Sequence, residues 1–82
     1  MKGTKFYAVY FPEEISDWGD KYFSNLKKAQ KYVESMINDT CEALDATYEG
    51  VPSWRITLRY DFRSNFNKQD TYHIFIELCH IE

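Results

Sequence analysis

The chain has 82 residues, a length that builds one small hydrophobic core, so we expect residues 1–82 to form a single domain. Hydrophobic residues make up 44% of the chain and aromatic residues 18%, with 3 Gly and 2 Pro, which excludes a disordered tail. The net charge of −3 gives no general attraction to nucleic acid or to anionic membranes.

The cysteines and the apolar runs bear on the compartment. Cys41 and Cys79 form neither a CxxC pair nor a dense framework, so we expect reduced thiols, as in a cytosolic protein. The apolar run 6–11 ends at Pro12 and is too short for the core of a secretory signal or for a membrane span. We therefore expect a cytoplasmic protein with no membrane partner.

The first predicted strand covers residues 4–11, which are rich in aromatic and β-branched side chains. Pro12 ends it, because proline cannot donate a hydrogen bond to a strand ladder. Alternation turns one of two sets of side chains toward the core, and the sequence leaves both open: Tyr7, Val9 and Phe11, or Phe6, Ala8 and Tyr10.

Residues 12–20 are predicted to form an acidic loop with two apolar residues, Ile15 and Trp18. Its carboxylates lack the alternate-residue ligand spacing of an EF-hand, so we expect no metal site: Glu13, Glu14, Asp17 and Asp20. We expect instead a recognition element, with Trp18 as the anchor and the carboxylates attracting a basic partner. Residues 21–23 either add a short strand or only lead into the next element.

A helix is predicted to follow, capped by Ser24 or Asn25. Its apolar positions follow three-four spacing and give one stripe toward the core: Leu26, Ala29, Val33, Met36, Ile37, Thr40 or Cys41, and Leu44. Residues 38–40 are a weak point, because Asp39 to Glu42 also match a capping box that would start a second helix. The sequence leaves open one bent helix or two.

Residues 46–53, with Gly50 and Pro52, are predicted to connect the helix to a β-hairpin. Segments 54–62 and 72–80 both alternate large apolar residues with other types, and 64–70 form their loop. If Phe62 pairs with Tyr72, one face of the hairpin is wholly apolar. The other face then sets Arg59 opposite Phe75, Asp61 opposite His73, Thr57 opposite Glu77 and Arg55 opposite Cys79.

These elements predict an α+β fold with a small three- or four-stranded sheet, one main helix on one face, β-α-β-β order and a C-terminal hairpin. The first strand either lies parallel to a hairpin strand through a right-handed crossover or joins an edge antiparallel to its neighbour.

The residue spacing does not indicate an enzyme or a metal site. Cys79 and His80 point to opposite faces of a strand, and His73 lies roughly 20 Å from Cys79 along it. No spacing gives a Ser-His-Asp or Cys-His arrangement, and the Gly residues are too scattered to form a phosphate loop. We expect neither catalytic residues nor a cofactor.

The best predicted binding feature is the stripe Arg55, Arg59 and Arg63 with Phe75 across the hairpin. A guanidinium beside an aromatic ring grips a carboxylate or stacks on a base, and this pair of residue types is typical of interface cores. Alternatively, Asp61 and Glu77 neutralise the arginines on a solvated face. So few arginines in an acidic domain favour a protein partner over nucleic acid.

In size, in its Tyr, Lys, Asn and Ile usage and in its sheet-plus-helix layout, the chain resembles the small phage-encoded proteins that block host defence, the anti-CRISPR proteins among them. The resemblance implies a non-catalytic inhibitor in the host cytoplasm that occupies a site on a larger protein or nucleoprotein complex. Alternatives are an immunity-type protein that neutralises a toxin, and a small nucleotide-ligand binder. A homodimer through the hairpin edge is a further possibility.

Overall fold

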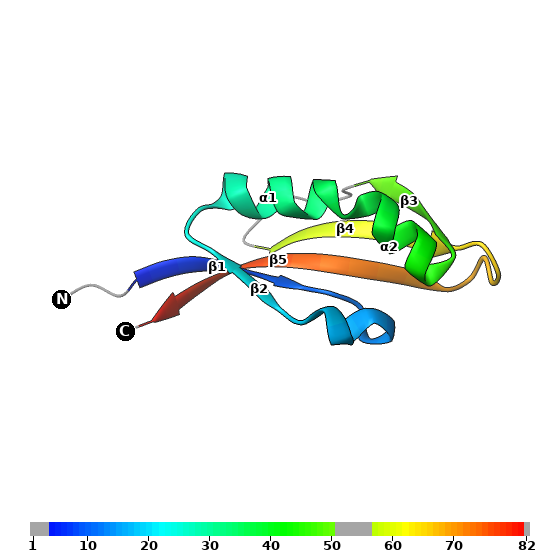
Figure 1. Cartoon of the computed structure of the whole chain (residues 1–82), viewed down its shortest axis with the longest axis horizontal. Helices are drawn as coiled ribbons and strands as arrows, with labels where there is room; N and C mark the ends of the chain where they lie inside the picture. Colours follow the sequence, from blue (N-terminus) through cyan, green and yellow to red (C-terminus); the bar gives the residue numbers. More distant parts are fainter. Residues whose placement is uncertain (1–3, 51–56, 82) are drawn as a thin grey trace.

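The structure, a computed structural model, describes residues 4–50 and 57–81. These residues form one antiparallel sheet of five strands with helices on one side (Figure 1). The elements in chain order are β1 (Thr4–Tyr10), the 3₁₀ segment η1 (Glu13–Trp18), β2 (Lys21–Phe23), α1 (Leu26–Ser35), α2 (Ile37–Leu44), β3 (Ala46–Gly50), β4 (Thr57–Ser64) and β5 (Thr71–Ile81). Across the sheet the strands stand in the order β2-β1-β5-β4-β3.

The α+β class is confirmed, but the predicted three or four strands in β-α-β-β order are wrong in detail. Residues 21–23 do form a strand, which pairs with β1. Residues 46–50, predicted as a connection, form β3 on the outer side of β4. Ala46 is buried, and the Tyr48 ring packs against Phe62 with centroids 5.3 Å apart. This strand therefore depends on tertiary contacts, which its short sequence does not predict.

Strand β1 lies inside the sheet, antiparallel to both β2 and β5. The parallel alternative is thereby excluded, and the described β1 is not an edge strand. Tyr7, Val9 and Phe11 belong to the core beneath the helices, with Val9 fully buried. Of the two sets that the sequence left open, this one faces the core.

The helical region consists of two helices. The Asn25 side chain caps α1 by accepting the Lys28 backbone N–H at 2.9 Å. The break falls at Met36, which lies between the two helices with φ of −99° and ψ of 0°. Its N–H donates to the Val33 carbonyl oxygen at 3.0 Å, a tight turn that separates α1 from α2. The capping box at residues 39–42 therefore lies inside α2, and the predicted weak point at 38–40 is wrong.

The hairpin register is as predicted within the described residues. Phe62 pairs with Tyr72 and Arg59 with Phe75, and Asp61 and Thr57 pair with His73 and Glu77. The predicted pairs of Ile56 and Arg55 fall in 51–56, outside the described residues. The apolar face of the hairpin forms the core with the helices, where Tyr60, Phe62, Ile74 and Ile76 are at most 2% exposed and pack with Val33.

Truncating a core ring tests this packing. We expect Phe62→Ala to lower the free energy of unfolding by about 3 to 5 kcal/mol, since Phe62 is fully buried. Phe66→Ala is the matched control, because the Phe66 side chain is 93% exposed, and it should change stability by less than about 0.5 kcal/mol. Urea unfolding measures both, and equal losses would contradict the placement of Phe62.

Burial of the Tyr60 phenol also makes stability depend on pH in the alkaline range. Burial, with the Glu34 carboxylate contributing, raises the pKa of Tyr60 from 10.0 to about 12. The neutral phenol therefore contributes stability that is complete below about pH 10 and is lost as the pH rises to about 12.

In the wild-type protein, the titration of Tyr60 alone should lower the free energy of unfolding by about 1.4 kcal/mol at about pH 11. Tyr60→Phe removes the titrating group. Between pH 9 and pH 11, the free energy of unfolding of this variant should therefore fall by about 1.4 kcal/mol less than that of the wild type. Urea unfolding at the two pH values measures the difference, and parallel losses in both proteins would show that Tyr60 is not the group responsible.

Candidate functional site

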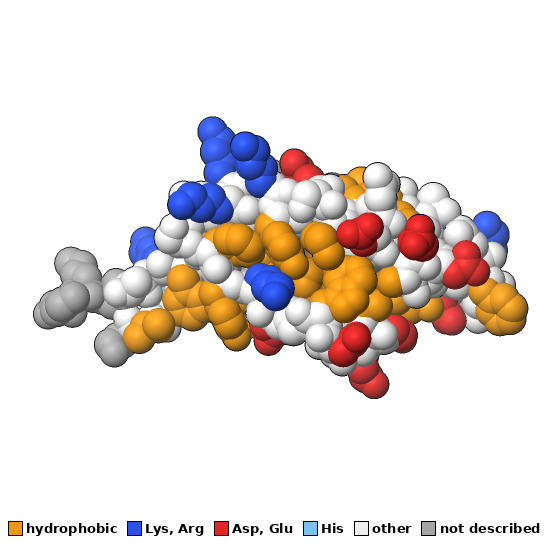
Figure 2. Space-filling view, viewed as in Figure 1, with side chains coloured by type: hydrophobic (Ala, Val, Ile, Leu, Met, Phe, Trp, Pro, Cys, Tyr) orange, Lys and Arg blue, Asp and Glu red, His pale blue; other side chains and the backbone are white. Residues whose placement is uncertain are grey.

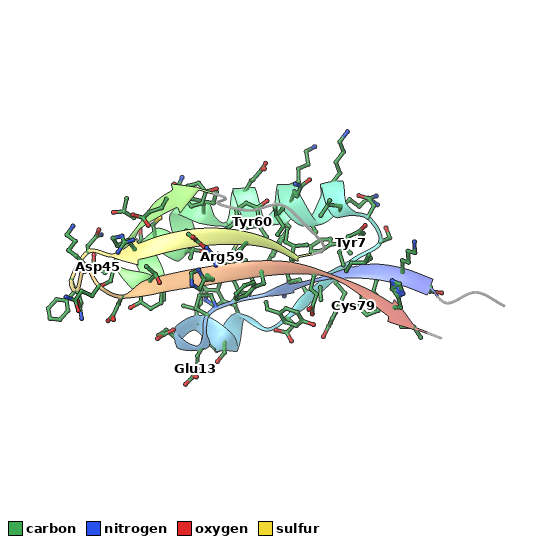
Figure 3. All side chains as sticks on the ribbon, turned by 180° about the vertical axis from the view of Figure 1, so that it is seen from behind. Tyr7, Glu13, Asp45, Arg59, Tyr60 and Cys79 are labelled. Carbon is green, nitrogen blue, oxygen red and sulfur yellow. The ribbon has the colours of Figure 1, made fainter. Side chains whose placement is uncertain are left out.

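The sheet has one face without helices, which we call the open face. α1 and α2 pack on the other side, and Figure 3 looks onto the open face, where the labelled Arg59 stands on β4 and Cys79 on β5. Strand alternation places these side chains there: Phe6, Ala8, Tyr10, Tyr22, Arg59, Asp61, Arg63, His73, Phe75, Glu77 and Cys79. Among them, Tyr22 is 62% exposed and Phe75 36%.

A three-residue network fixes the centre of the open face. The Asp61 carboxylate is only 17% exposed and stands between Arg59 on its own strand and His73 on β5. Arg59 Nη2 donates to Asp61 Oδ2 at 3.1 Å, and its Nε makes an ionic contact with Oδ1 at 2.8 Å. His73 Nδ1 lies 2.8 Å from the same Oδ1, so this nitrogen carries the proton that the carboxylate accepts.

Arg63 is also paired. Its Nε donates to Glu49 Oε2 at 2.8 Å and its Nη1 to the Lys68 carbonyl oxygen. The hydrogen bond and charge of Glu49 raise the pKa of Arg63 above its ordinary value. Both described arginines of the predicted stripe therefore have carboxylate partners, and Arg55 lies outside the described residues.

Aromatic side chains occupy the other end of the open face. Phe6 and Tyr22 meet edge to face with centroids 5.8 Å apart. Ala8 is fully buried although no helix covers it, because the larger Phe6, Tyr10 and Tyr22 lie around it on the same face. Burial, then a hydrogen bond with Cys79, raises the pKa of Tyr10. This end is an aromatic cluster that partly covers itself.

Trp18 does not project as a free anchor. It is half-buried, and its ring meets Phe11 edge to face at 5.3 Å, on the helix side of the sheet. Phe11 in turn contacts Tyr32 of α1. The predicted carboxylates all lie on the surface: Glu13, Glu14, Asp17 and Asp20. Figure 2 shows apolar side chains between α1 and η1, with lysines gathered over α1.

The two predicted surfaces meet at a notch in the sheet. Its walls are residues 11–14 on one side and residues 70–73 with Phe75 on the other, and it encloses about 520 Å³. We call this the β5 notch. It brings Glu13 and Glu14 beside His73 and Phe75, whereas Asp17, Trp18, Arg59 and Arg63 do not line it.

The cysteines, histidines and carboxylates of the described residues are the groups to consider for metal binding or catalysis. Residues 4–50 and 57–81 contain no group of three or more His, Cys, Asp or Glu side chains that could hold a metal ion. Cys41 and Cys79 are free thiols, and Cys79 Sγ lies 3.7 Å from the Glu77 carbonyl oxygen. The His73–Asp61 pair has no nucleophile in hydrogen-bond contact among these residues.

Comparisons of the chain with models of protein families, with curated proteins and with solved structures found no match. Among the described residues, no helix is both long enough and apolar enough to cross a membrane.

Sequence reasoning missed Phe6, Tyr10 and Tyr22 as surface residues and missed the notch altogether. The alternation in residues 4–11 did contain Phe6 and Tyr10 as one of its two faces. Tyr22 joins them only because β2 pairs with β1, with Ala8 opposite Tyr22. The notch depends on Pro12, which the sequence did identify as the end of the strand, and on the pairing of β1 with β5, which the sequence left open.

The central network can be tested by neutralising its carboxylate. Asp61→Asn keeps the side-chain shape but removes the charge that Arg59 and His73 share, so we expect a loss of about 1 to 2 kcal/mol in unfolding free energy. Glu49→Gln is the matched control, because its ion pair with Arg63 is more exposed and should contribute less. Urea unfolding at low salt compares them, and a larger loss in Glu49→Gln would contradict the network.

Proposed function

We propose that this protein is a non-catalytic protein-binding module, an inhibitor of a defence or nucleic-acid-handling complex, and that it binds its partner through the open face. One observation carries the proposal. A sheet face without helices presents two exposed aromatic rings, Tyr22 and Phe75, and Phe75 lies beside Arg59, whose position Asp61 already fixes.

The composition of this face suits a protein interface. Aromatic residues and arginine supply most of the binding energy at protein interfaces, when a partner covers them. Tyr22 and Phe75 retain exposed area for such contacts, and Tyr10 and Arg59 pair with Phe75 on either side in the sheet. Because Asp61 already orders Arg59, little side-chain entropy is lost when a partner contacts the guanidinium.

The charge on this face argues against a nucleotide or nucleic acid as the ligand. Arg59 and Arg63 are each paired with a carboxylate, and Glu77 adds a further negative charge. Each of these guanidinium charges is already compensated by Asp61 or Glu49, so an anionic ligand would gain little electrostatic energy from either arginine. The alternative of a small nucleotide-ligand binder therefore finds little support in the geometry.

The experiment is a capture of the partner with matched variants. The tagged chain is expressed in a bacterial host, crosslinked and purified, and the bound proteins are identified by mass spectrometry. We expect Phe75→Ala and Tyr22→Ala each to weaken binding of the captured partner about 10- to 30-fold, because both rings are exposed on the open face. Phe66→Ala is the control, an exposed phenylalanine on the hairpin loop.

Circular dichroism confirms that each variant is folded. Full binding by both open-face variants would contradict the choice of surface. A captured component of a defence or nucleic-acid-handling complex supports the inhibitor role, whereas a toxin in its place supports the immunity-type alternative. Recovery of the chain alone, in a host that carries its natural partners, would contradict a protein-binding function.

A further inference from the structure

Strand β5 is longer than its neighbour β1, and the difference leaves part of its edge open. β5 has 11 residues and β1 has 7. Their pairing ends with Tyr10 opposite Phe75, whereas β4 continues to pair with β5 as far as Thr71. Over Thr71–Ile74, β5 has a strand partner on one side only, among the residues that the structure describes.

The hydrogen-bond pattern shows which peptide groups face the open side. The Ser64 N–H donates to the Asp70 carbonyl at 3.0 Å, so this carbonyl turns toward β4, while the Asp70 N–H donates to the Asn67 carbonyl within the loop at 2.9 Å. Because an antiparallel strand directs successive residues to opposite neighbours, Tyr72 and Ile74 also bond to β4. Thr71 and His73 then direct their N–H and C=O groups into the β5 notch, where no β1 residue pairs with them.

Pro12 explains why β1 stops here. Proline has no N–H to continue the ladder, and its carbonyl accepts the Ile15 N–H at 3.0 Å, which turns the chain into η1. The chain thus leaves the sheet beside residues that still have hydrogen-bonding capacity. The result is the space of about 520 Å³ between η1 and β5.

The walls of the notch are acidic. Glu13, Glu14 and Asp70 line it, all with exposed side chains, and no Lys or Arg of the described residues does. Figure 3 shows Glu13 projecting from η1. Phe11, Tyr72 and Phe75 add aromatic surface. An entering chain therefore meets unpaired backbone groups, apolar rings and negative charge together.

We propose that the β5 notch binds a short, extended, basic segment of the partner protein, which adds to β5 as a strand beside Thr71–Ile74. This inference rests on the proposed protein-binding function and specifies what part of the partner is recognised. Backbone bonds to Thr71 and His73 hold the segment, and Glu13, Glu14 and Asp70 select Lys or Arg within it. The open edge matches about four residues, roughly 13 Å of strand.

The test begins with a displayed library of random octapeptides selected against the whole chain. We expect enrichment of sequences that combine Lys or Arg with apolar residues and lack proline in their central part. Enrichment of acidic or of unrelated sequences, or no enrichment over an unrelated protein of similar charge, would overturn the proposal.

The strongest enriched peptide then tests the backbone contacts. A version N-methylated at alternate residues keeps its side chains but loses N–H donors, and we expect about tenfold weaker binding in fluorescence anisotropy. Thr71→Pro removes the N–H of Thr71 from the notch and should weaken the unmodified peptide similarly, whereas Thr71→Val keeps this N–H and should bind normally.

Since Thr71→Pro can disturb the fold, Glu13→Gln with Glu14→Gln provides an independent variant on exposed side chains. It should weaken the peptide and reduce the salt dependence of binding. Unchanged affinity in this variant and with the N-methylated peptide would overturn strand addition at the notch.

Failure of this inference can be told from failure of the proposed function. Tyr22 lies on β2 and does not line the notch. If Tyr22→Ala weakens the captured partner while the Glu13 and Glu14 variant binds it fully, the open face acts without the notch. If neither change affects the partner, both proposals are wrong.

Discussion

The unequal covering of the sheet is the constraint on which the rest of this structure depends. The helices cover one face of the five-stranded sheet, and that face holds the main cluster of buried residues. The open face has no second layer and must therefore limit its exposed apolar area with its own side chains. It does so in two ways: aromatic rings close over Ala8 at one end, and carboxylates pair with arginines at the other. Neither arrangement removes the exposed area of Tyr22 and Phe75, which is the area that the proposed partner would cover.

The arginines of the open face act mainly on groups close to them. Lysines gather over α1, as Figure 2 shows, whereas the arginines of the open face are paired with Asp61 and Glu49. The charge of a paired, partly buried arginine is compensated locally, so its long-range electric field is weak. Its main contribution to binding is the fixed orientation of its N–H donors. Recognition on the open face would therefore depend on the fit of rings and on the orientation of Arg59. Under the proposed function, the exposed carboxylates around η1 would attract a basic partner.

The sequence predicted the features that depend on a regular pattern of apolar residues, which are the hairpin register and the core face of the helices. The hairpin register followed from the apolar residues of β4 and β5, because a slip by one residue would expose Tyr60, Phe62, Ile74 and Ile76. The core face of the helices followed from their spacing in the same way. β3 and the site of the helix break did not, since the short strand Ala46–Gly50 and the turn at Met36 depend on tertiary contacts and on local backbone geometry. Trp18 looked like a surface anchor because the sequence does not show that η1 folds back onto Phe11. The notch was equally hidden, because two strand lengths and one proline define it together.

An open strand edge normally invites another copy of the same protein, and the charges around this one oppose that outcome. Two copies that paired through their notches would bring Glu13, Glu14 and Asp70 of each toward the same residues of the other. Like charges placed close together disfavour such pairing, as charged residues on the edges of natural sheets do. Under the proposed strand addition, the same carboxylates would attract a basic segment. The acidic wall would then favour a foreign basic chain over a second copy of this chain at the open edge.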